Sequence, residues 1–247
     1  MAKNSFAIIG NSRLARSLAD LCAEKGVDAL LMSAIDDLSP TAPLVIDTYV
    51  AGEKKKSLLQ KLDQFLPAST VIVTSCVGCG VTQLAASLTK PERVAGFATF
   101  YPMRDRKVIE LAAGLRSDAG ALSAVESFFK SLGKETVRVK DTAGLTFPRI
   151  LSLIINEAAR ALEEGVASAD EIDVAMRLGV NYPQGPLKWA DQIGLDEVLA
   201  VLEGLLHETG DDRYRPAPLL KRLVTAGFLG ETSGRGFYAY NESQVKP

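Results

Sequence analysis

Short apolar runs separated by helical patterns make up the first half of the chain. Runs of adjacent apolar residues are typical of strands that are buried on both faces of a parallel sheet. Between these runs, apolar residues recur at a spacing of three and four, which places them on one face of a helix. The alternation predicts an α/β domain with a doubly wound parallel sheet. The predicted strands lie at residues 6–10, 29–32, 44–46, 70–73, 94–97 and 136–139, and the predicted helices at 14–25, 55–65 and 121–132.

Near residue 142 the pattern changes to helix alone. The turn-forming residues 141–144, Asp-Thr-Ala-Gly, separate the two parts. Beyond them, Ser168 and Glu171 have the spacing of a capping box that opens a helix. Further predicted helices run from near Ile150, Glu197 and Leu219. We therefore predict a Rossmann-like domain of the dinucleotide-binding type over residues 1–142 and an all-helical domain over residues 143–247.

The composition is that of an ordinary globular protein. Apolar residues make up 47% and charged residues 23% of the chain, and the net charge is -2. The basic run at residues 54–56 is too short for a nucleic-acid surface, and we interpret it as the exposed face of a helix. No apolar stretch has the length of a membrane span, and the N-terminus has no signal-peptide pattern. We expect a cytoplasmic protein that binds neither nucleic acid nor membranes.

The chain has three cysteines and one histidine, which limits the kinds of disulfide, metal and catalytic site that it can form. An odd number of cysteines argues against a disulfide framework. Cys76 and Cys79 have the C-x-x-C spacing but lack the second pair of ligands that zinc needs, so we predict no metal site. We interpret them as buried or half-buried thiols that line a loop. His207 lies at the end of a predicted helix, where a histidine meets the helix dipole favourably, and we assign it no catalytic role.

The helical half carries a series of motifs that follow one another in a fixed order. They are N-E-A at 156–158, L-E-E-G-V-A at 162–167, P-Q-G-P-L at 183–187, D-Q-I-G-L-D at 191–196, A-G-F-L-G at 226–230 and S-G-R-G-F-Y at 233–238. Each motif alone is a weak signal. Together they resemble the C-terminal domain of 3-hydroxyacyl-CoA dehydrogenases. The resemblance implies the two-domain fold of that family and a homodimer or heteromer that associates through the helical domain.

The first half resembles the same family less closely. The segment P-E-R-V-A-G-F at 91–97 is similar to the one before the family's catalytic strand, and K-V-I-E-L at 107–111 is similar to its K-L-V-E-V. Only about a dozen residues separate the predicted strands at 29–32 and 44–46. Typical members have a helical hairpin in this interval that helps to hold the CoA moiety. The resemblance therefore implies that this chain has lost the hairpin.

The family's reaction depends on a histidine that takes the hydroxyl proton while a hydride passes from the substrate to nicotinamide, and on a glutamate that orients this histidine. In the register of the two segments above, the histidine position is Ala98, which offers no proton acceptor. The glutamate position is kept as Glu110, and the asparagine before the proline is replaced by Tyr101. The family's substrate-binding serine and second asparagine are replaced by Val77 and Pro148.

The expected cofactor loop is also altered. A dinucleotide-binding fold has the pattern G-x-G-x-x-G/A after its first strand, followed by an acidic residue at the end of the second strand. Here Gly10 keeps the turn and Ala15 is an acceptable third position, but Ser12 replaces the second glycine and Arg13 adds a bulky cation. Ser33 stands at the acidic position. The loop is poorly suited to tight NAD binding, and it leaves open a weaker phosphate site formed by Ser12 and Arg13 at the helix N-terminus.

Two functions follow from the resemblance. The function that we favour from the sequence is that of a degenerate family member in acyl-CoA metabolism, of the fatty-acid or aromatic-acid β-oxidation type. With its active site eroded, it would act as a partner, regulatory or acyl-CoA-binding subunit. The alternative is an active NAD(H)-dependent oxidoreductase that acts on 3-hydroxyacyl-CoA with Tyr101 and Glu110 as acid and base. That alternative requires both a new proton-transfer group and nicotinamide held by an altered loop.

Overall fold

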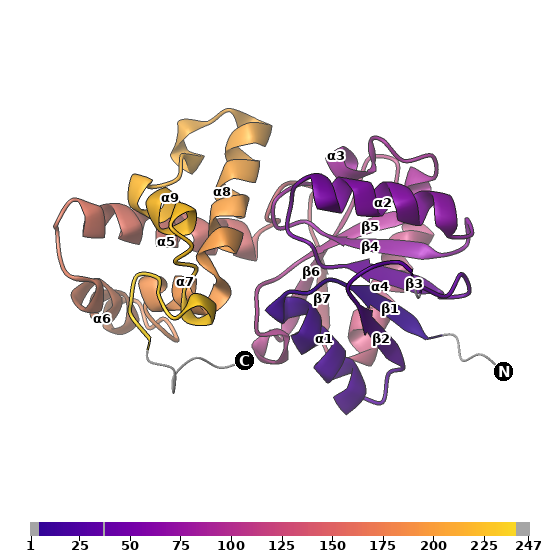
Figure 1. Ribbon diagram of the computed structural model, residues 1–247, viewed down its shortest axis with the longest axis horizontal. Coiled ribbons are helices and arrows are strands. Elements are labelled where there is room, and N and C mark those ends of the chain that lie inside the picture. Colours follow the sequence, from indigo (N-terminus) through magenta and orange to yellow (C-terminus); the bar gives the residue numbers. More distant parts are fainter. Residues whose placement is uncertain (1–4, 37, 241–247) are drawn as a thin grey trace. The chain divides into compact units, whose positions relative to one another are not determined.

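The computed structural model describes residues 5–36 and 38–240. The chain divides into two compact units, Met1–Phe147 and Pro148–Pro247 (Figure 1). The first unit contains the sheet and the second contains helices. A functional division after residue 142 stays a prediction, because compact units reflect packing and not ligand binding.

The first unit is built on one seven-stranded sheet. Its strands are β1 (Phe6–Ile9), β2 (Ala29–Met32), β3 (Leu44–Asp47), β4 (Val71–Ser75), β5 (Val94–Ala98), β6 (Val108–Ala113) and β7 (Glu135–Arg138). Their order across the sheet is β2-β1-β3-β4-β5-β6-β7. All neighbouring pairs are parallel except β5 and β6, which are antiparallel. The predicted doubly wound sheet is therefore confirmed, with the difference that it is antiparallel between β5 and β6.

Strand β6 is the one strand of this sheet that the apolar pattern did not predict. It carries Glu110 in the middle of its apolar residues, and this charge interrupts the run that marks the other strands. It also follows β5 without a helix of more than one turn between them, so it falls outside the strand–helix rhythm. The antiparallel register places Ala98 of β5 directly opposite Glu110.

Helices cover both faces of the sheet (Figure 1). They are α1 (Arg13–Glu24), α2 (Glu53–Phe65), α3 (Val81–Ala85) and α4 (Ala119–Ser131). Apolar residues of α1 and α4 pack on one face, and those of α2 and α3 pack on the other. Between β2 and β3, the described residues 33–36 and 38–43 form no helix. This agrees with the predicted loss of the helical hairpin.

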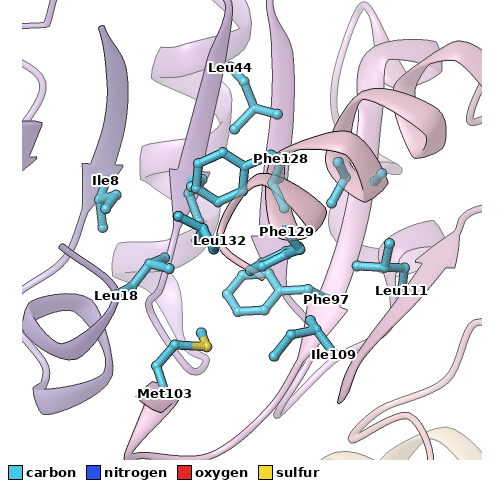
Figure 2. Close-up of a cluster of buried hydrophobic side chains, with 14 of the residues drawn as sticks. Ile8, Leu18, Leu44, Phe97, Met103, Ile109, Leu111, Phe128, Phe129 and Leu132 are labelled. Carbon is cyan, nitrogen blue, oxygen red and sulfur yellow. The ribbon is translucent and has the colours of Figure 1, made fainter. Parts of the chain in front are cut away.

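The core beneath α1 and α4 combines aliphatic side chains with a group of packed phenylalanines (Figure 2). Phe97 of β5 is completely buried, and its ring lies 5.5 Å from that of Phe129 in α4. Phe128 of the same helix packs edge-on against Phe6 of β1, with ring centroids 5.0 Å apart. Burying each such side chain stabilises a fold by roughly 1.5–3 kcal/mol. This packing fixes the sheet whose carboxyl edge carries the candidate site.

The second unit consists of helices joined by short loops. They are α5 (Phe147–Glu163), α6 (Ala169–Gly179), α7 (Pro186–Ile193), α8 (Leu195–Thr209) and α9 (Pro218–Thr225). The predicted capping box of Ser168 and Glu171 is confirmed at the start of α6. Helix α7 was not predicted, because its opening proline resembles a break. The proline is tolerated at the first helical position, and the Asp173 carboxylate accepts the next two backbone N–H groups, at 2.8 and 2.9 Å.

Lys55 shows that residues 54–56 are not simply an exposed helix face. Lys54 and Lys56 are exposed, but Lys55 is completely buried. Its Nζ lies 2.5 Å from Oδ2 of Asp47, which is also completely buried at the end of β3. Thr74 of β4 donates to the same carboxylate oxygen at 2.7 Å. The interpretation was wrong for Lys55, because a buried carboxylate on β3 needs a cation and α2 turns this one lysine toward it.

We predict that Lys55→Met costs about 3–5 kcal/mol of unfolding free energy, because it leaves Asp47 as an unpaired buried charge. Urea unfolding of the variant measures this cost. Lys54→Met is the matched control and should change stability by no more than about 0.5 kcal/mol. The double variant Asp47→Asn/Lys55→Met should recover much of the loss. Equal stability of the two single variants would contradict the assigned ion pair.

Candidate active site

The carboxyl ends of the parallel strands bring several candidate residues to one edge of the sheet. Residues 10–15 follow β1, Tyr49 follows β3, and Tyr101 follows β5. In doubly wound folds, ligands bind in the crevice outside these strand ends. The positions predicted from the cofactor loop and from the segment after β5 therefore belong to the same edge.

Gly10 and Ala15 have the geometry of the first and third small positions of a dinucleotide turn. Gly10 has a φ of +152°, and a Cβ there would lie 2.0 Å from Oγ1 of Thr48. Thr48 is buried and its hydroxyl donates to the carbonyl oxygen of Ile9 at 2.9 Å, so it holds its place against the turn. Ala15 is completely buried in α1. A larger side chain at either position would push α1 away from the strand ends.

Ser12 caps helix α1. Its Oγ accepts a hydrogen bond from the backbone N–H of Ala15 at 3.2 Å. Such a cap satisfies one of the amide groups that a helix N-terminus otherwise offers to an anion. In the described structure Ser12 therefore acts on the helix itself, and its predicted role as a phosphate ligand stays a prediction.

Arg13 and Tyr101 lie against each other although 88 positions separate them in the sequence. The guanidinium carbon of Arg13 is 4.0 Å from the centre of the Tyr101 ring, a cation–π contact. Tyr101 is half-buried, and its carbonyl oxygen accepts a hydrogen bond from Nη2 of Arg106 at 3.2 Å. The structure thus brings together one residue predicted for cofactor binding and one predicted for catalysis.

Arg106 is a further residue at this edge that the sequence analysis missed. Besides Tyr101, it bonds the carbonyl oxygen of Phe100 through Nε at 3.3 Å, and its guanidinium lies 5.2 Å from the centre of the Phe147 ring. Burial lowers the pKa of Arg106 below its usual value. Its position in the loop after β5 was the only signal in the sequence. Arg106 therefore holds the backbone of Phe100 and Tyr101 in place.

Glu110 is held by the start of helix α5. Its carboxylate accepts the backbone N–H of Thr146 at 2.7 Å and that of Phe147 at 3.0 Å. Burial raises the pKa of Glu110, while these two N–H groups act in the opposite direction. Within residues 5–36 and 38–240, no hydrogen bond joins Glu110 to Tyr101. The two predicted catalytic residues are instead connected indirectly, because Arg106 contacts both Tyr101 and Phe147 and the N–H of Phe147 bonds Glu110.

The arrangement of residues at this edge is broadly that of a site for the phosphates of a dinucleotide. Gly10 supplies the tight turn, Ala15 lets α1 approach the sheet, and Arg13 adds a cation at the N-terminus of that helix. Two positions differ from such a site. Ser12 uses one helix amide, and Ser33 replaces the carboxylate expected after β2. The arrangement suits the phosphates of a dinucleotide, and weaker binding than that of a complete glycine-rich loop stays a prediction.

Of the remaining reactive side chains, Cys76 and Cys79 follow β4 at the same edge, and His207 belongs to the helical unit. Cys76 is completely buried, which raises the pKa of its thiol, and Cys79 is half-buried, as the sequence analysis expected. His207 is exposed in the last turn of α8. The described part of the chain contains no cluster of three or more histidine, cysteine or acidic residues that could hold a metal ion. Among the same residues, no helix combines the length and apolar character that crossing a membrane requires.

Two family models together match most of the chain. Residues 144–240 match the C-terminal domain of 3-hydroxyacyl-CoA dehydrogenase, and residues 31–142 match the NAD binding domain of the same family. The chain belongs to the 3-hydroxyacyl-CoA dehydrogenase family. The match to the NAD binding domain begins after the turn at Gly10, so the phosphate turn lies outside the matched segment.

Curated members of the family align over most of their own length. The probable 3-hydroxybutyryl-CoA dehydrogenase of Bacillus subtilis is 36% identical over 244 residues, which cover 94% of this chain and 85% of that protein. The 3-hydroxybutyryl-CoA dehydrogenase of Clostridioides difficile is 38% identical over 200 residues, or 81% of this chain and 71% of that one.

Solved structures of the family have the same fold. The (S)-3-hydroxybutyryl-CoA dehydrogenase PaaH1 of Ralstonia eutropha superposes with a TM-score of 0.81 at 32% identity, covering 97% of this chain and 99% of that one. FadB2 of M. tuberculosis superposes with a TM-score of 0.86 at 26% identity, covering 96% and 99%. These likenesses extend over both units, and they confirm the family that the motifs of the helical half indicated.

We predict that Glu110 makes stability depend on pH. Because the pKa of Glu110 is raised above its ordinary value of 4.5, the folded chain keeps this proton to higher pH than the unfolded chain does. The group therefore lowers stability as the pH rises from about 4.5 through its raised pKa. Glu110→Gln removes this effect, so the unfolding free energy of the variant minus that of the wild type should rise across that window.

Urea unfolding at a series of pH values measures this difference. Glu157→Gln changes an exposed glutamate in α5 and serves as the control, whose difference from the wild type should stay flat. A flat difference for Glu110→Gln as well would contradict a raised pKa at this carboxyl.

Proposed function

We propose that this chain is an NAD(H)-dependent oxidoreductase that acts on 3-hydroxyacyl-CoA with substitute residues at the proton-transfer step. The observation that carries the proposal is the contact between Arg13 of the phosphate turn and Tyr101 of the segment after β5. The names of the relatives support a short acyl chain, since those from Bacillus subtilis and Clostridioides difficile are named probable 3-hydroxybutyryl-CoA dehydrogenase and 3-hydroxybutyryl-CoA dehydrogenase. The comparisons thus favour the alternative from the sequence analysis over the eroded subunit that we preferred there.

The phosphate turn would hold the dinucleotide through the N-terminus of α1, with Arg13 neutralising phosphate charge. A bound nicotinamide supplies the hydride acceptor for oxidation, or the hydride donor for reduction. The chain itself must move a proton to or from the oxygen on C3 of the substrate. Ala98 has no group that can do so, and both oxygens of Glu110 are engaged by backbone N–H groups. Of the two predicted catalytic residues, Tyr101 is therefore the one with a transferable proton.

Tyr101 has a phenolic O–H, which can donate a proton when a 3-ketoacyl-CoA is reduced. The Arg13 guanidinium is a cation over the face of the ring that carries this hydroxyl. Arg106 positions this tyrosine through its backbone carbonyl. Glu110 supports the turn that starts α5 and takes no part in proton transfer in this proposal. Association of copies through the helical unit stays a prediction.

We predict that Tyr101→Phe lowers kcat for the NADH-dependent reduction of acetoacetyl-CoA by about 10²- to 10⁴-fold, the usual contribution of a positioned acid. NADH binding should change little, because the ring that contacts Arg13 is kept. Absorbance of NADH at saturating substrate measures the rate, and a fluorescence titration measures binding. Tyr182→Phe removes a hydroxyl from the helical unit and is the control. Equal kcat values for Tyr101→Phe and the wild type would exclude Tyr101 as the acid.

A second candidate function is a ligand-binding member without turnover. The specific observation in its favour is Ala98, which β-sheet register places opposite Glu110, where a histidine would meet its glutamate. In this case the chain would bind acyl-CoA or dinucleotide as a partner or regulatory subunit. Wild-type turnover separates the two candidates directly.

We predict that Ala98→His increases oxidation of 3-hydroxybutyryl-CoA at neutral pH by about 10²- to 10⁴-fold, because it adds a base beside Glu110. If the wild type has no turnover and only the variant does, the second candidate is favoured. Ala98→Phe, which adds a ring without a base, is the control for crowding at this buried position. An inactive but folded Ala98→His variant would contradict the assignment of position 98 as the lost base.

A further inference from the structure

Tyr49 reaches across the end of strand β1. It follows β3, and its phenol oxygen donates a hydrogen bond to the carbonyl oxygen of Ser33 at 3.3 Å. Ser33 follows β2, and the order β2-β1-β3 places β1 between these two strands (Figure 1). The tyrosine side chain therefore spans the carboxyl end of β1, where the chain enters the turn at Gly10.

The buried ion pair beneath Tyr49 fixes its backbone on both sides. The N–H of Tyr49 donates to Oδ1 of Asp47 at 2.9 Å, and its carbonyl oxygen accepts from Nζ of Lys55 at 2.7 Å. Both side chains of the pair are completely buried. The phenol is therefore held toward Ser33 by a rigid support and not by the loop alone.

The place that the Tyr49 phenol reaches is the one where a dinucleotide fold normally has a carboxylate. An acidic residue at the end of β2 binds the 2′-hydroxyl of the adenosine ribose in NAD, and its charge opposes the 2′-phosphate of NADP. Here that position is Ser33, and the phenol lies against its carbonyl. A phenol both donates and accepts. While it donates to Ser33, it can accept a hydrogen bond from a ribose hydroxyl, and a protonated phenol has no charge that repels phosphate.

We propose that Tyr49 takes the place of the missing carboxylate as the ribose-binding residue, and that the crevice therefore accepts NADPH about as well as NADH. This inference rests on the proposed use of a nicotinamide dinucleotide. It adds the residue that sets cofactor preference and the reason for that preference.

Titration of the full chain with NADH and with NADPH, followed by nucleotide fluorescence and without any acyl-CoA, tests the inference. The two Kd values should agree within about threefold for the wild type. Tyr49→Phe should weaken NADH binding by about two- to tenfold, the effect of one lost hydrogen bond. Ser33→Asp, at an exposed position, should create a preference for NADH of about tenfold or more.

Two variants serve as controls. Tyr182→Phe removes a hydroxyl elsewhere and should leave both Kd values unchanged. Asp36→Asn tests the next carboxylate along the chain after Ser33 and should also leave them unchanged. The inference is overturned if Tyr49→Phe binds NADH as the wild type does, if Asp36→Asn alone abolishes a wild-type preference for NADH, or if neither dinucleotide binds.

Failure of this inference can be told apart from failure of the proposed function, because the titration measures binding and a separate assay measures turnover. A chain that binds both dinucleotides through Tyr49 but never oxidises NADH would refute the oxidoreductase proposal and leave this inference standing. A chain that reduces acetoacetyl-CoA with NADH but not with NADPH, and whose Tyr49→Phe variant binds NADH as the wild type does, would support the oxidoreductase proposal and refute this inference.

Discussion

The buried ion pair of Asp47 and Lys55 ties together the elements that form the candidate site. It joins the end of β3 to helix α2, its carboxylate also receives the hydroxyl of Thr74 on β4, and both partners bond the backbone of Tyr49. Two buried charges are stable only when hydrogen bonds support the pair, and here Thr74 and the backbone of Tyr49 provide them. The carboxyl edge of the sheet therefore has little freedom near β1 and β3, and the Tyr49 phenol keeps its place at Ser33.

Much of this fold follows from the sequence, because buried parallel strands leave continuous apolar runs and helices leave a spacing of three and four. The capping box at Ser168 was equally visible, since both partners are local. Contacts between distant residues were not visible in this way. Nothing near Lys55 in the sequence shows that it faces a buried carboxylate, and nothing near Arg13 shows that it stacks on Tyr101. Strand β6 was not predicted because Glu110, whose carboxylate accepts the N–H groups of Thr146 and Phe147, interrupts the apolar run.

The chain has the fold of its family, but several residues at the carboxyl edge of its sheet differ from the family pattern. Family models match both units, while Ala98, Tyr101 and Ser33 depart from the expected pattern on the β-sheet unit. The structure adds that the replacements form contacts of their own: Arg13 lies on Tyr101, and Tyr49 bonds Ser33. Neutral residues stand at the positions of a base and a carboxylate, and Arg13 adds a cation at this edge. Such a site is suited to give a proton and to tolerate phosphate, and this change in charge connects the proposed reaction with the proposed cofactor preference.

The central claim is that hydride transfer survives without the histidine, and a single-turnover experiment on the unaltered chain tests it most directly. Excess protein is mixed with NADH and acetoacetyl-CoA, and the absorbance of NADH is followed while 3-hydroxybutyryl-CoA is quantified at the end. The account predicts that NADH is consumed in equal amount to the 3-hydroxybutyryl-CoA formed, with NADPH able to replace it. Unchanged NADH in a protein shown to bind both ligands would contradict the account.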